Sequence, residues 1–394
     1  MSDPTIFETA PKSAESPKEG TILESAASVE NSESAALAEN SPGETASPKK
    51  TYRALGLLSG GLDSILATRL LMEQGIEVEC VNFHTGFCIQ THTGAIRNPK
   101  PGKPPPRHDA LYAAEQLGVK LHMVDISEVY VEIVTNPKYG YGKNLNPCLD
   151  CKIFMVKKAW EMKESMGFDF LFTGEVVGER PMSQRRDTMP LIEREAGVTG
   201  WLLRPLTALT LPETEPEKRG WVDRARLKHI TGRSRKPQMA LAADLGIEEY
   251  PSPAGGCCFL TDENYARRLQ DLWDSRGTKR YTLDDIVLLK AGRHVRPSPD
   301  YKVIVGRDRS ENNFLSGFRK GRWLLQVQGM PGPLALVEGE PGEEGLKLAC
   351  RLVARFGKGR DLPEVAVSAE GPDGREIYKV APMSAMEVQE SWYV

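Results

Sequence analysis

The hexapeptide Ser-Gly-Gly-Leu-Asp-Ser at residues 59–64 directly follows an apolar run at residues 54–58. A buried strand that breaks into a Ser/Gly turn and then opens a helix is typical of a phosphate-binding site. Glycine lets backbone N–H groups approach the anion, and the helix N-terminus adds partial positive charge. Apolar residues at 65, 66, 70 and 71 predict that helix, and Gly75 predicts its end. Asp63 would repel a phosphate, so we expect a magnesium ion to bridge the two.

Two cysteines form a second chemical signal in the stretch Asn146-Pro147-Cys148-Leu149-Asp150-Cys151. Asn146 suits a helix N-cap and Pro147 suits the first helical position, so both cysteines should lie on the opening turn of a helix. That placement is expected to lower the thiol pKa and to favour thiolate. Because one helical turn separates them, both sulfur atoms can face one iron–sulfur cluster or one zinc ion. Two buried apolar thiols are the structural alternative.

A distant pair, Cys257 and Cys258, follows two glycines. Adjacent residues of a strand point to opposite sides, so at most one of the two is expected to join the first pair. Cys148, Cys151 and Cys257 are the candidate ligands of a [4Fe–4S] cluster, whose fourth iron would stay open for sulfide; four cysteines would instead make a closed zinc site. Among the other cysteines, Cys80 and Cys350 fall in patterns typical of core, and Cys88 is left unassigned.

Alternating strands and helices predict an α/β domain with a parallel sheet covered on both faces. The pattern places strands at residues 54–58, 77–83, 120–125 and 168–172, and helices at residues 108–117 and 148–165. Ligands of such sheets bind at the carboxyl ends of the strands. Residues 59–63, the residues after Phe83, and Thr173-Gly174-Glu175 should therefore face one crevice. Phe83 could line an adenosine there, or it could belong to the core.

The hexapeptide resembles the PP-loop of the ATP pyrophosphatase (adenine nucleotide alpha hydrolase) superfamily, and it lacks the Gly-Lys-Ser/Thr ending of a Walker P-loop. The resemblance implies a Rossmann-like HUP-type domain that binds ATP with Mg²⁺ and transfers AMP to a carbonyl oxygen. By this resemblance Asp63 is a catalytic residue. The nucleotide-binding residues that we expect are Ser59, Gly60, Gly61, Asp63, Ser64, Phe83, Thr173 and Gly174.

Three further stretches narrow the resemblance to the tRNA thiouridine synthases and tRNA 2-thiouridylases. Residues 173–178 (Thr-Gly-Glu-Val-Val-Gly), Ser183-Gln184 and Arg204-Pro205-Leu206 are similar to stretches of the 4-thiouridine synthases. Cys151 matches the first catalytic cysteine of the 2-thiouridylases, and Cys257 or Cys258 falls at the second. The resemblance spans roughly residues 52–260. The chain departs from the better-known 4-thiouridine synthases because no N-terminal RNA-binding domain precedes the PP-loop and no rhodanese domain is evident.

Composition divides the 394-residue chain into regions. Residues 1–50 hold nine acidic and four basic residues with one aromatic, so we expect a disordered tail. The tail has a net charge of −5 and the whole chain one of −3, which leaves residues 51–394 with a net charge of +2.

No secretory or mitochondrial signal and no apolar membrane span is evident, and seven cysteines suit a reducing compartment. We therefore expect a cytoplasmic protein without a membrane partner. The domains expected are residues 51–260 (PP-loop sulfurtransferase), 261–298 (helical connector) and 299–394 (small α+β).

RNA contacts are predicted from a basic segment between residues 218 and 236, which holds eight Lys or Arg residues and one acid. Arg180, Arg185 and Arg186 could extend this path, whereas a solvated helix face is the structural alternative. In the last domain, residues 306–313 (Gly-Arg-Asp-Arg-Ser-Glu-Asn-Asn) are similar to a motif of the NFACT-type RNA-binding domain. The partners expected are tRNA and a sulfur donor, either sulfide or a persulfide carrier protein. A homodimer is left open.

The leading hypothesis is an ATP-dependent tRNA sulfurtransferase that adenylates a uridine or cytidine carbonyl oxygen and replaces it with sulfur. The sulfur would come from a Cys151 persulfide that Cys257 or Cys258 resolves, or from sulfide on an open iron, which the CxxC favours. The sequence leaves two alternatives. One is a PP-loop ligase or amidotransferase acting on a small molecule, and the other is a non-enzymatic RNA-binding protein with zinc. Thiamine-related sulfur transfer is a further use of the same chemistry.

Overall fold

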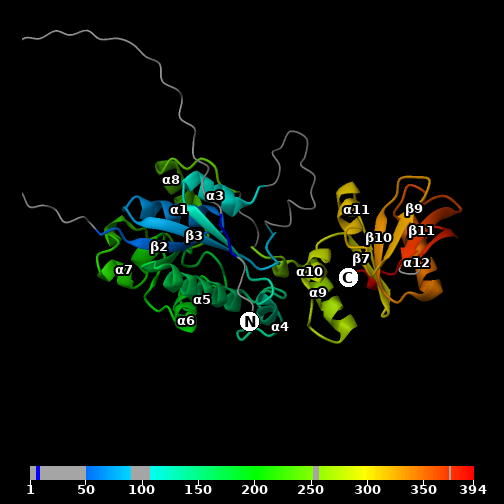
Figure 1. Ribbon diagram of the computed structural model, residues 1–394, viewed down its shortest axis with the longest axis horizontal. Coiled ribbons are helices and arrows are strands. Elements are labelled where there is room, and N and C mark those ends of the chain that lie inside the picture. Colours follow the sequence, from blue (N-terminus) through cyan, green and yellow to red (C-terminus); the bar gives the residue numbers. More distant parts are fainter. Residues whose placement is uncertain (1–5, 9–49, 90–106, 252–256, 372–373) are drawn as a thin grey trace, which may run out of the picture.

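The computed structural model describes residues 6–8, 50–89, 107–251, 257–371 and 374–394, which form two α/β units joined by two helices (Figure 1). The first unit holds the Ser-Gly-Gly turn and the cysteines 148, 151, 257 and 258, whereas the second is built around a separate sheet. The glycines before Cys257 lie outside the described residues.

Five parallel strands form the sheet of the first unit, in the order β4-β3-β2-β5-β6. Their bounds are Arg53–Leu57 (β2), Glu77–His84 (β3), Lys120–Asp125 (β4), Phe170–Thr173 (β5) and Leu202–Leu203 (β6). The predicted fold class, a parallel-sheet Rossmann-like domain followed by a smaller α+β domain, is confirmed. A short strand, β1 (Ile6–Glu8), pairs antiparallel with β4 inside the tail that we expected to be unfolded.

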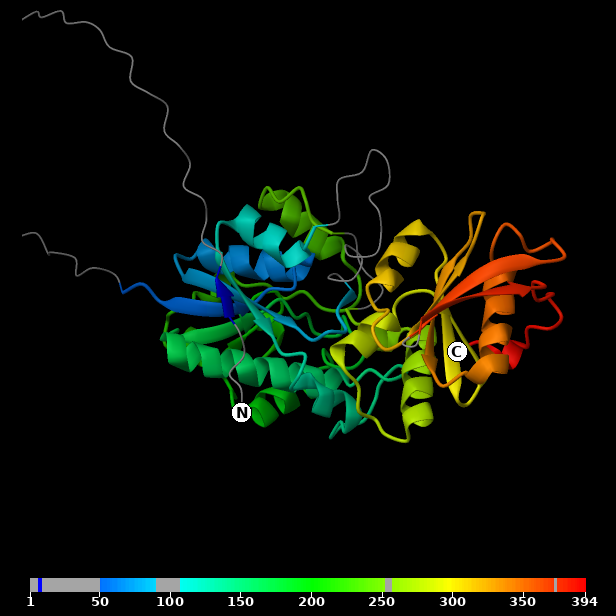
Figure 2. The same ribbon diagram turned by 45° about the vertical axis from the view of Figure 1, so that its right-hand side comes forward.

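Helices cover both faces of this sheet, as Figure 2 shows. On one face lie α1 (Leu62–Met72), α3 (Asp109–Leu117) and α8 (Lys236–Asp244), and on the other α4 (Tyr130–Thr135), α5 (Cys148–Met166) and α6 (Thr188–Ala196). Short helical turns complete the unit: η1 (Ala208–Thr210), α7 (Glu215–Lys218), η2 (Arg224–Arg226) and η3 (Phe259–Thr261). Each face has its own apolar core, which explains why the strands read as nearly continuous apolar runs.

The strand order reverses at β2, which has β3 on one side and β5 on the other. The chain builds outward from β2 to β4 and then crosses back to β5 and β6. In open parallel sheets, ligands bind outside the carboxyl ends of the strands at such a reversal. The residues that follow β2 and β5 are the Ser-Gly-Gly turn and the Thr-Gly-Glu stretch, so the topology places both at this point.

The second unit contains a six-stranded antiparallel sheet in the order β12-β11-β9-β10-β8-β7. Its strands are β7 (Arg293–Ser298), β8 (Tyr301–Val305), β9 (Trp323–Val327), β10 (Leu334–Gly339), β11 (Val365–Gly371) and β12 (Gly374–Val380). It also holds α11 (Arg309–Ser316), α12 (Gly342–Arg355) and the final turn η4 (Glu390–Trp392). The connecting helices are α9 (Glu263–Arg276) and α10 (Leu283–Leu288); β7 lies in the range expected for the connector but pairs with β8.

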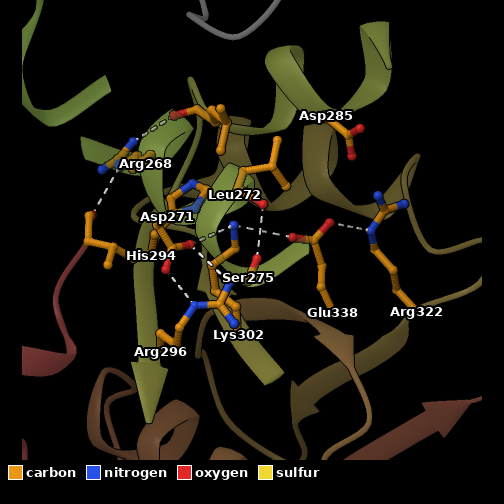
Figure 3. Close-up of polar contacts among 12 residues, drawn as sticks. Arg268, Asp271, Leu272, Ser275, Asp285, His294, Arg296, Lys302, Arg322 and Glu338 are labelled. Carbon is orange, nitrogen blue, oxygen red and sulfur yellow. Dashed lines mark hydrogen bonds and ion pairs between the residues drawn. The ribbon is translucent and has the colours of Figure 1, made fainter. Parts of the chain in front are cut away.

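A buried ion-pair cluster joins the connector to the second sheet (Figure 3). Lys302 on β8 is 1% exposed and lies 3.5 Å from a carboxylate oxygen of both Asp271 on α9 and Glu338 on β10. Arg296 binds Asp271, and Arg322 donates to Glu338 over 2.8 Å. The cluster satisfies every charge that it buries, as a structural role requires.

Among the described residues, no helix is long and apolar enough to cross a membrane.

Candidate functional site

The Ser-Gly-Gly turn is held in a fixed shape. Gly60 has a φ of +81°, and a Cβ atom placed there would lie 2.3 Å from the carbonyl carbon of Asp109 on α3, so only glycine fits. The Ser64 hydroxyl donates to the Gly61 carbonyl over 2.8 Å, and the Gly61 N–H donates to Ser59 Oγ over 3.3 Å. Because α1 begins at Leu62, the turn delivers its backbone to a helix N-terminus, which favours an anion.

The Thr-Gly-Glu stretch packs directly on this turn. A Cβ atom on Gly174 would lie 2.5 Å from the backbone of Asp63 and of Ser64, so glycine permits the close approach. The predicted nucleotide-binding residues at positions 59–64 and 173–174 are therefore brought together. Phe83, by contrast, is 7% exposed and lies in the apolar core that also contains Phe87.

Several polar atoms near the turn are buried and lack hydrogen-bond partners. They belong to two carboxyl groups and to two side chains at the start of α8. Asp63 Oδ1, Glu179 Oε2, Arg235 Nε and both amide atoms of Gln238 are buried without a hydrogen-bond partner. Arg235 lies 3.6 Å from Asp63. Buried polar atoms are nearly always paired in folded proteins, so this set indicates a ligand. Two carboxylates beside a phosphate-binding turn fit Mg²⁺, which takes one or two carboxylates together with phosphate oxygens.

The two carboxyl groups also influence each other's pKa. Burial raises the pKa of Asp63, with Arg235 opposing the shift, and burial together with Asp63 raises the pKa of Glu179 to about 7. The pair therefore holds a shared proton in the neutral range. A cation that binds between them has to displace this proton.

Cys148 and Cys151 open α5, as predicted, although Pro147 is the cap residue and Asn146 lies outside the helix. The Cys148 thiol donates to Ser183 Oγ over 3.6 Å. Burial raises the pKa of both thiols, and the Tyr130 hydroxyl beside Cys151 only partly offsets that rise. The expected thiolate preference is therefore wrong for this state, because the loss of water around the sulfur outweighs the helix N-terminus.

The second cysteine pair lies near the first. Cys257 is exposed, and its proximity adds to the rise that burial produces in the pKa of Cys148 and of Cys151. Cys258 is 9% exposed and belongs to the same apolar core as Tyr130, against which Cys151 packs. Both cysteines of the distant pair therefore lie near the CxxC, and they differ in their access to water.

The thiols and the nucleotide turn belong to one site. Lys152, next to Cys151, lies 3.4 Å from Glu175 of the Thr-Gly-Glu stretch, and Arg204 lies 3.3 Å from the same carboxylate. Burial alone would raise the pKa of Glu175, but the two cations hold it below its usual value. The charge of Arg180 acts on both Asp63 and Cys148, which places this side chain between the two halves.

The metal prediction receives no geometric support within the part of the chain that the structure describes. There, no group of three or more Cys, His, Asp or Glu side chains is arranged to hold a metal ion. The cluster or zinc ligation predicted for Cys148, Cys151 and Cys257 stays a prediction, and we derive no chemical step through it.

Much of the basic segment proves to be structural. Lys218 and Arg219 pair with Glu215, Arg224 pairs with Glu217, and Arg226 donates to the backbone of Glu73. A more open basic surface occurs in the second unit, where a cavity of about 950 Å³ lies between α11 and the end of α12. Its lining includes six cationic side chains: Arg293, Arg307, Arg309, Arg355, Lys358 and Arg360.

Each of the two units matches a family model. Residues 53–193 match the family model described as tRNA methyl transferase HUP domain, and residues 292–393 match the model described as NFACT protein RNA binding domain. The tRNA-specific 2-thiouridylase MnmA of Thermus thermophilus is 29% identical over 189 residues, which cover 44% of this chain and 51% of the relative. The larger domain is therefore similar to the tRNA thiolation enzymes and the smaller domain to the NFACT RNA-binding domain.

Two other matches give the range of similarity. The enzyme of the same name from Sulfurimonas denitrificans is 33% identical over 131 residues, which cover 30% of this chain and 33% of that protein. A solved 4-thiouridine synthetase bound to RNA and ATP is 19% identical, covers 50% of this chain and 52% of that chain, and has a TM-score of 0.30. The chain spans about half the length of the first curated relatives that it matches.

Several residues of the site were absent from the prediction. Glu179, Lys152, and the α8 pair Arg235 and Gln238 come from three separate segments, and only the folded chain brings them to the site. Lys152 adjoins Cys151, and Glu179 follows the Thr-Gly-Glu stretch after three residues. An ionisable residue this close to a motif is the one signal in the sequence that could have drawn attention to them.

Proposed function

We propose that this protein is an ATP-dependent tRNA sulfurtransferase that adenylates a carbonyl oxygen of uridine or cytidine and exchanges it for sulfur. The observation that carries the proposal is the continuity from Asp63 through Gly174 and Glu175 to Lys152 and the CxxC thiols. An anion-binding turn and a group of thiols within one site suit a reaction that activates an oxygen with a nucleotide and then attacks with sulfur.

The chain's own groups divide the first step among them. The backbone N–H groups at residues 59–64 and the start of α1 hold the phosphates of ATP, and Asp63 with Glu179 would hold Mg²⁺. When bound, the ion offsets the charge that develops on the leaving pyrophosphate. Arg235, which pairs with Asp63, is placed to contact a phosphate oxygen as well.

The thiols would perform the second step. Cys151 carries the transferable sulfur as a persulfide, whose terminal sulfur attacks the activated carbon and displaces AMP. Cys258 then attacks the Cys151 sulfur, which releases the thiolated nucleoside and leaves a Cys151–Cys258 disulfide. We assign this role to Cys258 because it shares the buried core with Tyr130 beside Cys151, whereas Cys257 is exposed. Sulfide on an open iron held by Cys148, Cys151 and Cys257 is the other route.

We assign RNA binding to the second unit. The cationic side chains of the 950 Å³ cavity, two of which (Arg307 and Arg360) pair with Glu311 and Asp361, supply charge for contact with a phosphate backbone. Phe356 in the lining lies under the Arg293 guanidinium at 5.0 Å. The 2-thiouridylases named above act on tRNA, which supports tRNA as the substrate of this chain.

The test is nucleoside mass spectrometry of tRNA from a strain that lacks the gene, complemented with plasmid-borne variants. We expect one thiolated nucleoside to be absent and to return with the wild type and with Cys350→Ala, a control thiol buried in the second unit. Cys151→Ser should fail to restore it. An unchanged nucleoside profile in the deletion strain would instead favour the small-molecule ligase, which needs no CxxC.

The two sulfur routes are separated by purifying the protein without oxygen and measuring iron and acid-labile sulfide. The persulfide route predicts less than one iron per chain and a persulfide on Cys151 by peptide mass spectrometry. About four irons per chain, lost in Cys257→Ser but kept in Cys258→Ser, would support the cluster route.

A further inference from the structure

Cys88 lies opposite Cys258 in an isolated antiparallel bridge. Phe259 N–H donates to the Phe87 carbonyl over 2.9 Å, and Ile89 N–H donates to the Cys257 carbonyl over 3.4 Å. The flanking residues, and not the two cysteines, therefore make the bridging hydrogen bonds. This pattern defines a non-hydrogen-bonded pair, in which the two side chains project to the same face with Cα atoms about 4.5 Å apart.

That spacing suits a disulfide. Bridged cysteines have Cα separations of about 4.4–6.8 Å, so a bond between Cys88 and Cys258 needs no movement of the strands. Both residues are thiols in this structure. Cys88 is half-buried with its sulfur 3.4 Å from Thr85 Oγ1, and the Cys258 sulfur accepts from Leu260 N–H over 3.4 Å.

A cation sits beside the pair. Lys290 follows α10 in the connector, and its ammonium donates to the Gly86 carbonyl over 2.6 Å. Burial lowers the pKa of Lys290 to about 8, while Cys88 and Cys258 act in the opposite direction. A nearby cation stabilises thiolate, the form that attacks a disulfide.

Cys258 thus has two thiol neighbours. Cys88 lies opposite it in the bridge, and Cys151 packs against the apolar core that contains Cys258. Cys88 has no part in the sulfur-transfer steps described above, and the sequence left it unassigned. Three thiols in series are an arrangement that can pass a disulfide from one pair to the next.

We propose that Cys88 is a relay thiol that takes over the disulfide left by each sulfur transfer and closes a Cys88–Cys258 bond. This role rests on the proposed function. The Cys88 thiolate attacks Cys258 Sγ, the Cys151–Cys258 bond breaks, and Cys151 leaves as thiolate. The proton lost by Cys88 is balanced by the one that Cys151 takes up, so the exchange needs no outside oxidant. A small dithiol then reduces Cys88–Cys258 and readies the enzyme for another turnover.

The first test needs neither ATP nor tRNA. Full-length protein is equilibrated with reduced and oxidised glutathione at set ratios, alkylated, and analysed by peptide mass spectrometry. We expect a Cys88–Cys258 linked peptide in the wild type and in Cys350→Ala, and its absence in Cys88→Ser. If Cys88 and Cys258 remain fully alkylated at the most oxidising ratio, the pair is not redox-active and the proposal is overturned. Because Cys258 is buried, circular dichroism checks that each variant is folded.

The second test concerns the relay. With the proposed thiolation running, wild type and Cys88→Ser should give the same product yield in a single turnover. Later turnovers of Cys88→Ser should slow about tenfold at limiting dithiol. Equal multiple-turnover rates would overturn the relay. If the wild type makes no thiolated nucleoside at all, the proposed function fails, while the linked peptide still reports on the dithiol pair.

Discussion

Two regions of this protein bury opposite charges, and they differ in whether the charges are satisfied. At the junction of connector and second sheet, Lys302 is enclosed by Asp271 and Glu338, and none of the three leaves a buried polar atom without a partner. At the Ser-Gly-Gly turn, Asp63 and Glu179 each retain an unpartnered oxygen. The first arrangement is complete without a ligand. The second needs one, which is what separates a structural cluster from a binding site here.

The largest effect is expected at the unsatisfied cluster. Asp63→Asn removes a charge that Mg²⁺ and the turn depend on, so AMP formation should fall by about 10²–10³-fold, as for loss of a transition-state contact. The fold should lose no stability, because the variant also relieves the repulsion with Glu179. AMP release from labelled ATP and the urea midpoint measure the two effects. A variant with full activity would contradict the Mg²⁺ assignment.

The satisfied cluster should show the reverse behaviour. Lys302→Met leaves Asp271 and Glu338 buried without their shared cation, which should cost about 3–5 kcal/mol of unfolding free energy. The rate of AMP formation per folded molecule should stay unchanged, since the site lies in the other unit. Denaturant unfolding of Lys302→Met beside the exposed control Lys320→Met separates burial from loss of charge. If the two variants are equally stable, the cluster is not structural.

The pH dependence of ligand binding is a third difference between the unsatisfied site and the satisfied cluster. The raised pKa of Glu179 means that the native site binds more protons than the unfolded chain between pH 4.5 and about 7, so this group stabilises less as pH rises through that window. Mg²⁺ with ATP must displace the shared proton, so its affinity should increase about tenfold from pH 6 to pH 8. Titration calorimetry on wild type and Glu179→Gln measures this. A wild type with pH-independent affinity would count against the shared proton.

The smallest effect is expected at Gln238, whose two amide atoms are buried without partners and which is 0% exposed. Gln238→Leu removes the unsatisfied atoms and should stabilise the ligand-free protein by up to about 1 kcal/mol. The KM for ATP should rise several-fold, because the leucine side chain cannot form the hydrogen bonds that the Gln238 amide offers to the ligand. Thermal unfolding measures the gain in stability, and steady-state kinetics measure the rise in the KM for ATP. A destabilised variant with an unchanged KM would mean that the amide serves the fold.

The local elements were largely predictable from the sequence. The strand at residues 120–125 has the predicted bounds, because apolar residues between turn residues specify a strand without tertiary help. The missed strand β7 begins with Arg293 and contains Pro297, a pattern that reads as loop. Only its pairing with β8 makes it a strand.

The site was predictable as motifs and not as a network. Gly60 has a φ of +81°, a requirement of its own backbone position, so its role could be inferred from residue type and position. Arg235 meets Asp63 across 172 positions of sequence, and nothing local marks that encounter. The thiol pKa was mispredicted for the same reason, since the helix position of Cys148 is local and its burial is a property of the fold.

Oxygen labelling tests the central claim, that the nucleotide turn and the thiols act on the same carbonyl. A tRNA transcript with ¹⁸O in its uridine carbonyls is incubated with the protein, ATP, Mg²⁺ and a persulfide donor, and the AMP is analysed by mass spectrometry. The account predicts one ¹⁸O in the phosphate of AMP for each thiolated nucleoside formed. Unlabelled AMP, or thiolated nucleoside formed without AMP, would contradict it.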